Sequence, residues 1–431
     1  MAKMTRRQML GRTALTGFTI CAAGTVRGFQ GQVTPNERLN IAMIGSGGRG
    51  AANLRSVRDE TIVALCDVDQ RQATSTYASY PTVPKFSDFR VMLEKMDRQI
   101  DAVVVSTPDH THAVATVAAM RQGKHCYCEK PLTHSVYESR VVSQVAGEHG
   151  VATQMGIQIH AGSNYRRVVE LVQSGAIGTV GECHVWINRS EGGGQLPTET
   201  PPVPDGLDWD LWLGPAPERP YHPCYLPREW NFWWDFGGGN LGAMGCHYMD
   251  LPFWALDLRH PTAIEASGPP LDPESTPRWL TIRYQFPARD LLPEVTVFYY
   301  DGGRQPDLLR QTGLTDWPSG VLFVGSDGML IADYNRRQLL PEDQFVDFEP
   351  PEPHIPDSIG HHREWLQACK TGGPTTCDFD YSGVVTEAVL LGNVSYRIGQ
   401  SIRWDAENLT AVGCPEADRF IRREYRRGWS L

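Results

Sequence analysis

The chain has 431 residues, of which 41% are hydrophobic and 21% are charged, and its formal net charge is -10. A single hydrophobic core rarely grows to this length, so we expect two domains. The negative charge argues against a nucleic-acid partner, because a phosphate backbone is bound through clustered lysine and arginine side chains. The net charge is compatible with a small polar or neutral molecule as the substrate.

The first residues indicate an export signal. Arg6 and Arg7 precede a weakly apolar run from Thr13 to Val26. That run is too short to be a comfortable membrane anchor, and no later stretch is long enough to span a bilayer. The pattern is similar to a twin-arginine leader, with a Sec signal or a plain tail as the alternatives. We therefore expect residues 1–31 to be a signal segment of a periplasmic or otherwise exported protein.

Short apolar runs alternate with helix-like segments from Leu39 onward. The first three runs are Leu39–Gly45, Thr61–Asp67 and Asp101–Thr107, and residues 124–131 and 151–156 supply later ones. Buried runs at this spacing are typical of a parallel sheet covered by helices on both faces. We predict an α/β protein whose first domain, residues 32–158, is a doubly wound Rossmann unit.

The pattern changes after about residue 178. Runs rich in valine, isoleucine and aromatic residues stand between glycine and proline clusters at 181–190, 279–286, 294–300 and 321–332. They predict a mostly antiparallel sheet in a second domain, residues 159–431. The stretch Gly192–Pro227 predicts a long loop, and such loops are often functional. Two helix-like segments, 361–372 and 380–399, close the chain.

A glycine pattern predicts a dinucleotide site. Gly45, Gly47 and Gly50 directly follow the first strand and open a helix, and Asp67 ends the second strand 22 positions after Gly45. The glycines permit a tight turn and a close approach of the backbone to a pyrophosphate at the helix N-terminus. Asp67 would bind ribose hydroxyls and repel a 2′-phosphate, which favours NAD over NADP. The alternatives are that Asp67 caps the next helix and that Arg71 meets a phosphate.

Two further motifs follow strands of the predicted parallel sheet. STPDHTH begins at Ser106 and CEKPLT at Cys128, and both would face the crevice at the carboxyl ends of the strands. With these motifs the chain resembles the Gfo/Idh/MocA family of oxidoreductases over roughly residues 38–431. Further supporting stretches are IAMIGSGGRG, GAIG, WLGPAP and GAMGCHYMDL, which begin at positions 41, 175, 212 and 242.

The resemblance implies a nicotinamide-binding Rossmann domain and a second α/β domain with a large open sheet. In the family that sheet covers the substrate and often mediates oligomerisation, so we expect a homo-oligomer. Cofactor contacts are expected from Gly45, Gly47, Gly48, Arg49, Gly50, Asp67, Thr107, Pro108, His112, Glu129 and Lys130.

The resemblance also implies two catalytic residues, Lys130 and His247. The ammonium group of Lys130 would lie near the reacting hydroxyl, and a desolvated lysine beside a cationic ring can exchange protons near neutrality. Pro131 suggests a cis peptide bond after Lys130. An imidazole at His247 suits the hydroxyl proton. An exposed lysine and a structural histidine are the alternatives.

One position departs from the family pattern. The family commonly carries aspartate four residues before the catalytic histidine, where this chain has Ala243. Either Lys130 and His247 suffice, or another group substitutes, for which His160, Tyr165 and Asp235 are candidates. Asp250 is expected to orient His247 or to cap local structure. The expected substrate contacts are His160, Tyr165, Trp234 and Asp250, with aromatic residues 230–234 available to stack on a sugar ring.

We expect no metal site, because the CxC pair Cys126 and Cys128 has no second pair nearby. The expected function is NAD-dependent oxidation of a hydroxyl on a sugar, cyclitol or glycoside, which is a small-molecule carbohydrate partner. The alternative is an NAD-requiring glycosidase or lyase that oxidises transiently and eliminates, although the related glycosidases lack EKP at this position. A sugar-binding sensor is a third possibility, disfavoured by Lys130 and His247.

Overall fold

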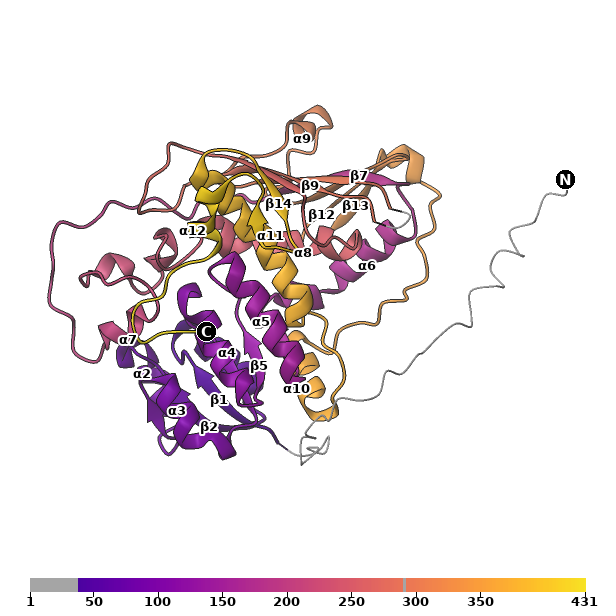
Figure 1. Cartoon of the computed structure of the whole chain (residues 1–431). Helices are drawn as coiled ribbons and strands as arrows, with labels where there is room; N and C mark the ends of the chain where they lie inside the picture. Colours follow the sequence, from indigo (N-terminus) through magenta and orange to yellow (C-terminus); the bar gives the residue numbers. More distant parts are fainter. Residues whose placement is uncertain (1–37, 290–291) are drawn as a thin grey trace. The chain divides into compact units, whose positions relative to one another are not determined.

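The computed structural model describes residues 38–289 and 292–431. Its first sheet has six parallel strands in the order β3-β2-β1-β4-β5-β6. This is the strand order of a doubly wound dinucleotide-binding sheet, so the predicted fold class is confirmed. The strands are β1 (Asn40–Ile44), β2 (Thr61–Cys66), β3 (Lys85–Phe86), β4 (Ala102–Val105), β5 (His125–Cys128) and β6 (Thr153–Met155). Strands β1, β2 and β5 of this sheet are labelled in Figure 1.

Helices bury both faces of this sheet. Because successive side chains of a strand point to opposite faces, Ile41 and Met43 of β1 join one hydrophobic cluster and Ala42 and Ile44 join another. Both clusters are needed, since each strand is apolar on both sides. The helices between the strands are α1 (Gly48–Val57), α2 (Gln70–Ser79), α3 (Phe89–Met96), α4 (His112–Arg121) and α5 (Val136–His149).

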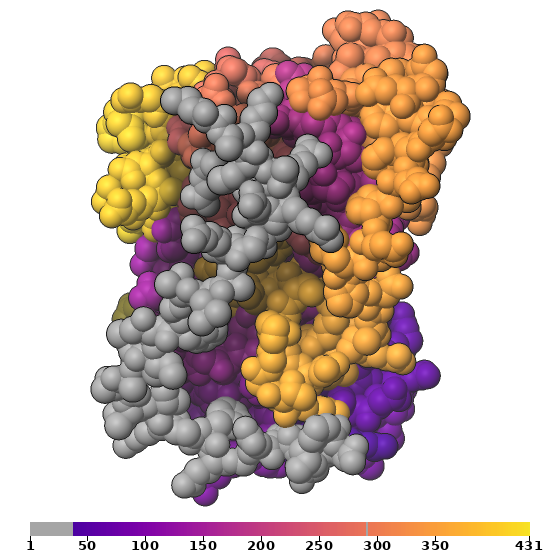
Figure 2. Space-filling view, turned by 90° about the vertical axis from the view of Figure 1, so that its right-hand side faces the viewer, coloured from indigo at the N-terminus to yellow at the C-terminus, as the bar shows by residue number. Residues whose placement is uncertain are grey.

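One helix of the first layer comes from far along the chain. Helix α10 (His361–Thr371) places Trp365 and Leu366 in the same cluster as Ile41 and Met43. The segment between β13 (Arg337–Leu340) and α10 runs over the surface toward the first sheet, and is orange in Figure 2. The expected boundary near residue 158 lies between the last strand of the first sheet and the first strand of the second. Helix α10 follows this boundary in the sequence, yet it packs against the Rossmann unit.

The second sheet has nine strands in the order β13-β12-β11-β7-β10-β9-β8-β14-β15. Its pairings are antiparallel except between β7 and β10, as the sequence predicts for a mostly antiparallel sheet. The remaining strands are β7 (Val180–Trp186), β8 (Ala263–Ser267), β9 (Thr281–Phe286), β10 (Val295–Tyr300), β11 (Gly320–Gly325), β12 (Met329–Ala332), β14 (Ile402–Asp405) and β15 (Thr410–Ala411).

Two long helices cover one face of the second sheet. Helix α8 (Gly239–Ala255) and helix α11 (Phe379–Ile398) share a hydrophobic core with Ile282 and Tyr284 of β9. Strand β9 alternates buried and more exposed positions, which is the pattern of a strand with one face on a core. The first turn of helix α8 reaches the Rossmann unit, since a Cβ on Gly242 would lie 3.7 Å from Asp109 Oδ2.

The predicted loop Gly192–Pro227 contains more regular structure than expected. It holds the short helix α7 (Trp209–Leu213), and its aromatic residues form a cluster with the segment that follows. Trp209 stacks on Trp212 with ring centroids 4.7 Å apart. Of the aromatic residues 230–234 that were expected to stack on a sugar ring, Trp233 is buried in this cluster, and Trp230 and Phe232 pack against it.

Among the described residues, no helix combines the length and the apolar character needed to cross a bilayer. The expected signal segment, residues 1–31 with Arg6 and Arg7, lies outside the described residues.

Candidate active site

The chain turns from β1 into α1 through a backbone that only glycine allows. Gly45 has a φ of +83°, and a Cβ there would lie 2.5 Å from the carbonyl oxygen of Ser106. A Cβ on Gly50 would lie 1.9 Å from the carbonyl oxygen of Gly45, so Gly50 is buried inside the turn rather than at its surface. This close packing brings the N-terminus of α1 to the crevice, where its free N–H groups suit phosphate oxygens.

A cavity of about 650 Å³ lies along this turn. Its volume is within the range of small-molecule sites. The hydroxyl oxygen of Thr107 is buried beside it without a hydrogen-bond partner, and is therefore available to a bound group. The residues present fit a dinucleotide, and those among the predicted cofactor contacts that line the cavity are Gly45, Gly47, Gly48, Arg49, Asp67, Thr107 and Pro108.

Asp67 both lines this cavity and holds the glycine turn. Its Oδ2 accepts hydrogen bonds from the backbone N–H groups of Ser46 at 2.8 Å and Gly47 at 3.0 Å. Burial raises the pKa of Asp67, and these bonds partly offset the shift. The residue that caps α2 is Asp69. Arg71 donates to Asp69 from Nε at 2.8 Å and from Nη2 at 2.7 Å, so its guanidinium is engaged there.

The outer wall of the cofactor cavity comes from distant parts of the chain. Leu211, Trp212, Leu226 and Trp230 of the aromatic segment line it, as does Trp429 near the end of the chain. The sequence analysis missed Trp429, because nothing in the local sequence places the C-terminal residues against the Rossmann unit.

A second cavity, of about 550 Å³, adjoins the first. Arg49, Ser106, Thr107, Arg228 and Trp230 line both cavities, which places the second one beyond the carboxyl ends of β4 and β5. Both predicted catalytic residues, Lys130 and His247, line this second cavity. Glu129 and Ala243, which the sequence motifs place next to them, line it as well.

Lys130 and His247 reach this cavity from different domains. Lys130 follows β5, and its peptide bond to Pro131 is cis, as expected. His247 lies on α8. Burial, with the positive charges of Lys130 and Arg49, holds the pKa of His247 well below its usual range, so the imidazole is neutral. Its Nδ1 is buried without a hydrogen-bond partner, which leaves the ring free to bond a substrate hydroxyl.

Glu129 has a positioning role. Its Oε1 accepts hydrogen bonds from Arg49 Nε at 2.9 Å, Asn53 Nδ2 at 2.9 Å and Gln158 Nε2 at 3.1 Å. The carboxylate packs so closely on Gly156 that a Cβ there would lie 2.7 Å from it. Glu129 therefore holds Arg49 at the junction of the two cavities.

His112 lines neither cavity. Its Nδ1 lies 2.7 Å from the carbonyl oxygen of Pro131, and its Nε2 lies 2.9 Å from that of Thr107. The ring is buried between the two motifs because α4 begins at His112 and turns it inward. The structure thus corrects the expected cofactor contact: His112 joins the Thr107 and Lys130 loops to each other.

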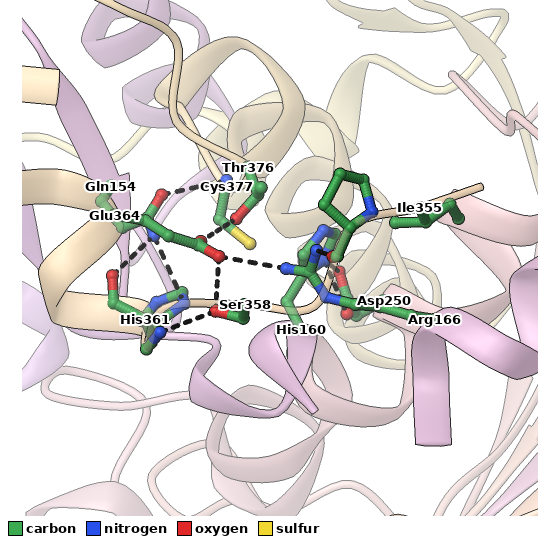
Figure 3. A network of polar contacts seen from close by, with 12 residues as sticks. Gln154, His160, Arg166, Asp250, Ile355, Ser358, His361, Glu364, Thr376 and Cys377 are labelled. Carbon is green, nitrogen blue, oxygen red and sulfur yellow. Dashed lines mark hydrogen bonds and ion pairs between the residues drawn. The ribbon is translucent and has the colours of Figure 1, made fainter. Parts of the chain in front are cut away.

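The expected substrate contacts are not at the cavity. Figure 3 shows His160 and Asp250 inside a polar network with Arg166 and Glu364. His160 Nδ1 lies 2.9 Å from Asp250 Oδ1, and the Tyr381 hydroxyl donates to the same oxygen at 2.7 Å. Neither residue lines the second cavity. Asp250 therefore bonds His160 and not His247, although the two residues lie three positions apart on α8.

The other two candidates are also buried elsewhere. Tyr165 is fully buried, with its ring 5.8 Å from that of Tyr334. Trp234 is 5% exposed and donates from Nε1 to the Asp272 carbonyl oxygen at 3.1 Å. Asp235, the remaining substitute for the missing carboxylate, pairs with Arg219. The expectations for His160, Tyr165, Trp234, Asp250 and Asp235 at the substrate site are therefore corrected.

Within the described part of the chain, one group of three side chains has the spacing of a metal site: His160, Asp250 and Cys377. His160 Nδ1 already forms a hydrogen bond with Asp250 Oδ1, and that oxygen also accepts one from the Tyr381 hydroxyl. Cys126 and Cys128 are buried and free.

Among the residues of the second cavity that sequence reasoning missed is Asp109. Asp109 stands within the STPDHTH motif, directly after β4, but no role was assigned to it. It lines the cavity with Lys130 and His247. The available signal was its position after a parallel strand of the sheet, where polar residues face the ligand crevice.

The parallel sheet, the glycine turn and the adjoining polar cavity define a dinucleotide-binding Rossmann protein with a second α/β domain. The chain belongs to the Gfo/Idh/MocA oxidoreductase family. Residues 39–157 match that family's NAD-binding Rossmann fold, and residues 163–290 match its C-terminal alpha/beta domain. The predicted Rossmann fold and the predicted NAD cofactor are thereby confirmed.

Individual relatives match over shorter stretches. A glycosyl hydrolase family 109 protein of Solibacter usitatus is 32% identical over 199 residues, which are 41% of this chain and 44% of that protein. An inositol 2-dehydrogenase of Rubrobacter xylanophilus is 33% identical over 148 residues, 33% of this chain and 42% of the relative. The chain thus matches less than half the length of these relatives.

Solved structures support the fold over a longer span. The WlbA dehydrogenase from Bordetella pertussis, in complex with NADH and UDP-GlcNAcA, superposes with a TM-score of 0.61 at 16% identity. The superposition covers 86% of this chain and 99% of that one.

Proposed function

We propose that this protein is an NAD-dependent oxidoreductase that oxidises a hydroxyl group of a sugar, cyclitol or glycoside. The observation that carries the proposal is that Lys130 and His247, from two different domains, line one polar cavity that adjoins the glycine-turn cavity. A substrate in the second cavity would lie between the two side chains and next to the nicotinamide end of the first.

The chain's own residues supply binding and polarisation. The glycine turn and the N-terminus of α1 would bind the phosphates of NAD, and the carboxylate of Asp67 would accept hydrogen bonds from the hydroxyl groups of its adenosine ribose. NAD, when bound, accepts a hydride from the carbinol carbon. Lys130 donates a hydrogen bond to the substrate hydroxyl and stabilises negative charge that develops on its oxygen. His247, as a neutral imidazole, fixes the orientation of the same hydroxyl.

The lining of the second cavity supports a polyhydroxylated substrate. Charged and amide groups face it from Arg189, Glu191, Arg228 and Asn231, and they can pair with hydroxyl groups. Trp230 adds an aromatic surface, which suits the apolar face of a sugar ring. The names of two relatives, an inositol dehydrogenase and a glycosyl hydrolase, agree with this substrate class.

The test begins with the cofactor. Protein purified without added nucleotide is denatured, and the released compound is identified by mass spectrometry. The native protein is then incubated with a panel of sugars, cyclitols and glycosides while NADH is followed by its absorbance. NADH formation with at least one polyol supports the proposal. Bound NAD with no NADH formed and no product from any compound would contradict it.

A glycosidase or lyase that oxidises its substrate transiently is the second candidate. It is favoured by the glycosyl hydrolase relative, which matches over a longer stretch than the inositol dehydrogenase. It is also favoured by the outer wall of the cofactor cavity, which would help to retain a bound nucleotide. An enzyme that returns its hydride to the substrate can keep the same nucleotide, because it has no need to release NADH. Such an enzyme would cleave a glycoside with no net NADH formation, and would exchange substrate hydrogen with deuterated solvent.

We also propose export through the twin-arginine pathway. The support is the Arg6 and Arg7 pair before an apolar run, together with a cofactor that must be loaded before export of a folded protein. Replacing both arginines with lysine should retain the protein in the cytoplasm of its host, as measured by fractionation. Unchanged export would leave the Sec pathway as the better explanation.

We further propose a homo-oligomer, as the family resemblance implies. The support is the nine-stranded sheet, whose helices lie on one face. Sedimentation equilibrium of the purified protein measures the mass directly, and a monomer at micromolar concentration would contradict the proposal.

A further inference from the structure

The second cavity is lined by the buried carboxyl group of Asp109. Asp109 is 2% exposed, and its Oδ2 has no hydrogen-bond partner. That oxygen lies against the first turn of α8, where a Cβ on Gly242 would be 3.7 Å from it. A buried polar atom without a partner is costly, and each one in a native structure calls for an explanation, of which a catalytic role is one.

The surrounding charges suit proton exchange. Burial raises the pKa of Asp109 to about 7, while the positive charge of Lys130 and the backbone N–H of Gly238 oppose the shift. The other ionisable groups that face the cavity are Arg49, Glu129, Arg189, Glu191, Arg228, Glu229 and His247. A carboxyl group that titrates near neutrality inside a ligand cavity is typical of a general base.

The other carboxyl groups of the cavity are less suited to this role. Glu129 already accepts three hydrogen bonds, and Glu191 pairs with Arg189. Glu229 is half-buried and accepts a hydrogen bond from the backbone N–H of Arg228 at 3.2 Å. Asp109 alone among these four combines burial with an unpartnered oxygen.

We propose that Asp109 is a catalytic residue that accepts the proton of the substrate hydroxyl, and so supplies the carboxylate that α8 lacks at Ala243. This inference rests on the proposed oxidoreductase function. The hydroxyl O–H bond breaks, its proton adds to Asp109 Oδ2, and its electron pair forms the second bond of the new carbonyl. The hydrogen of the carbinol carbon leaves as hydride, with both electrons of its bond, to the oxidised nicotinamide.

The geometry explains how a residue after β4 can replace one on α8. Gly242 has no side chain, so Asp109 Oδ2 can lie close to the first turn of α8, and the small side chain of Ala243 leaves room in the cavity that Asp109 and His247 both line. Lys130 lies on the same side and interacts electrostatically with Asp109. The three groups therefore come from three elements that meet at the strand ends.

The first measurement does not depend on turnover. Infrared difference spectra between pH 5 and pH 9 report the carboxyl stretch of buried acids, and pH values around neutrality bracket the expected titration. The holoprotein should show a carboxyl band that titrates near neutrality and is absent in Asp109→Asn. Asp301→Asn is the matched control, because Asp301 is also buried with its pKa raised to about 6 but lines neither cavity. Identical titrations in wild type and Asp109→Asn would overturn the proposal.

The second measurement uses a carbohydrate that the wild type oxidises. Asp109→Asn should lower kcat by roughly a hundredfold and leave NADH binding, followed by fluorescence, within about twofold. Oxidation by the wild type requires the carboxylate, so its kcat should rise with pH through about 7 and level off above. This rise should disappear in Asp109→Asn, persist in Asp301→Asn, and return in part in Asp109→Glu.

The outcomes separate the two ideas. A wild type that oxidises no polyhydroxy compound contradicts the proposed function itself. A wild type that does so, with unchanged kcat and an unchanged pH profile in Asp109→Asn, overturns only the role of Asp109. Circular dichroism and thermal unfolding of each variant show whether a lost activity reflects unfolding. If Asp109→Asn is unfolded, the activity of Asp109→Glu and the infrared titration of the wild type decide whether Asp109 is the base.

Discussion

The guanidinium of Arg90 lies 4.1 Å from the centroid of the Trp429 ring. Arg90 also donates from Nη1 to the carbonyl oxygen of Gly428 at 3.3 Å. Arg90 belongs to α3 of the first domain, so the last residues of the chain contact the Rossmann unit beside the cofactor cavity. This contact makes the C-terminal end part of the wall that a bound nucleotide would face.

Trp429→Ala should speed the release of NADH. Removing an aromatic wall that contributes roughly 1 kcal/mol predicts a dissociation rate about fivefold to tenfold higher. Stopped-flow displacement of NADH, followed by its fluorescence, measures the rate. Trp279→Ala is the matched control, since Arg304 lies 3.8 Å from that ring but neither residue lines the cavity. Equal rates in the two variants would remove Trp429 from the cofactor site.

Asp67→Asn should weaken the discrimination against NADP. An asparagine oxygen can still accept the Ser46 and Gly47 N–H bonds that hold the turn, whereas the charge that repels a 2′-phosphate is gone. We expect the ratio of NAD to NADP affinity to fall by about tenfold or more, which corresponds to roughly 1.4 kcal/mol. Calorimetric titration with both nucleotides checks this. An unchanged ratio would mean that Asp67 serves only the turn.

Lys130→Met and His247→Ala should each slow turnover by about a hundredfold while NAD binding persists, because each removes a group that the proposed function places at the reacting hydroxyl. Steady-state kinetics and NADH titration measure the two quantities separately. Full activity in His247→Ala would exclude it from catalysis. A Lys130→Met protein that no longer binds NAD would assign Lys130 to the cofactor or to folding.

Ala243→Asp should move the pH dependence of turnover upward. The new carboxylate would share a cavity with Asp109, and a like charge nearby raises the pKa of one member of such a pair, on the order of one unit or more. Activity at neutral pH should therefore fall and recover at higher pH. In an Asp109→Asn background the same substitution should instead increase activity. A pH profile identical to wild type would show that residue 243 does not act on Asp109.

Local sequence was sufficient to locate the glycine turn of the cofactor site, whereas the outer wall of that cavity comes from distant residues such as Trp429. The spacing of Gly45, Gly47 and Gly50 marks the turn, although the backbone that excludes a Cβ at Gly45 belongs to Ser106, which follows the neighbouring strand. The spacing of apolar runs predicted the parallel sheet because strands that are buried on both faces are apolar throughout and crossover helices separate them. The assignment of Lys130 depended on its motif, and its place in the cavity agrees with that assignment.

Only the tertiary structure decided which side chains share the substrate cavity. Asp109 lines that cavity with Lys130 and His247, whereas Asp250 pairs with His160, 90 positions earlier in the chain. Helix α10 and Trp429 likewise reach the Rossmann unit from the far end of the chain. Contacts between such distant residues depend on how helices and sheets pack, and packing is a property of the whole core that no local pattern of residues records.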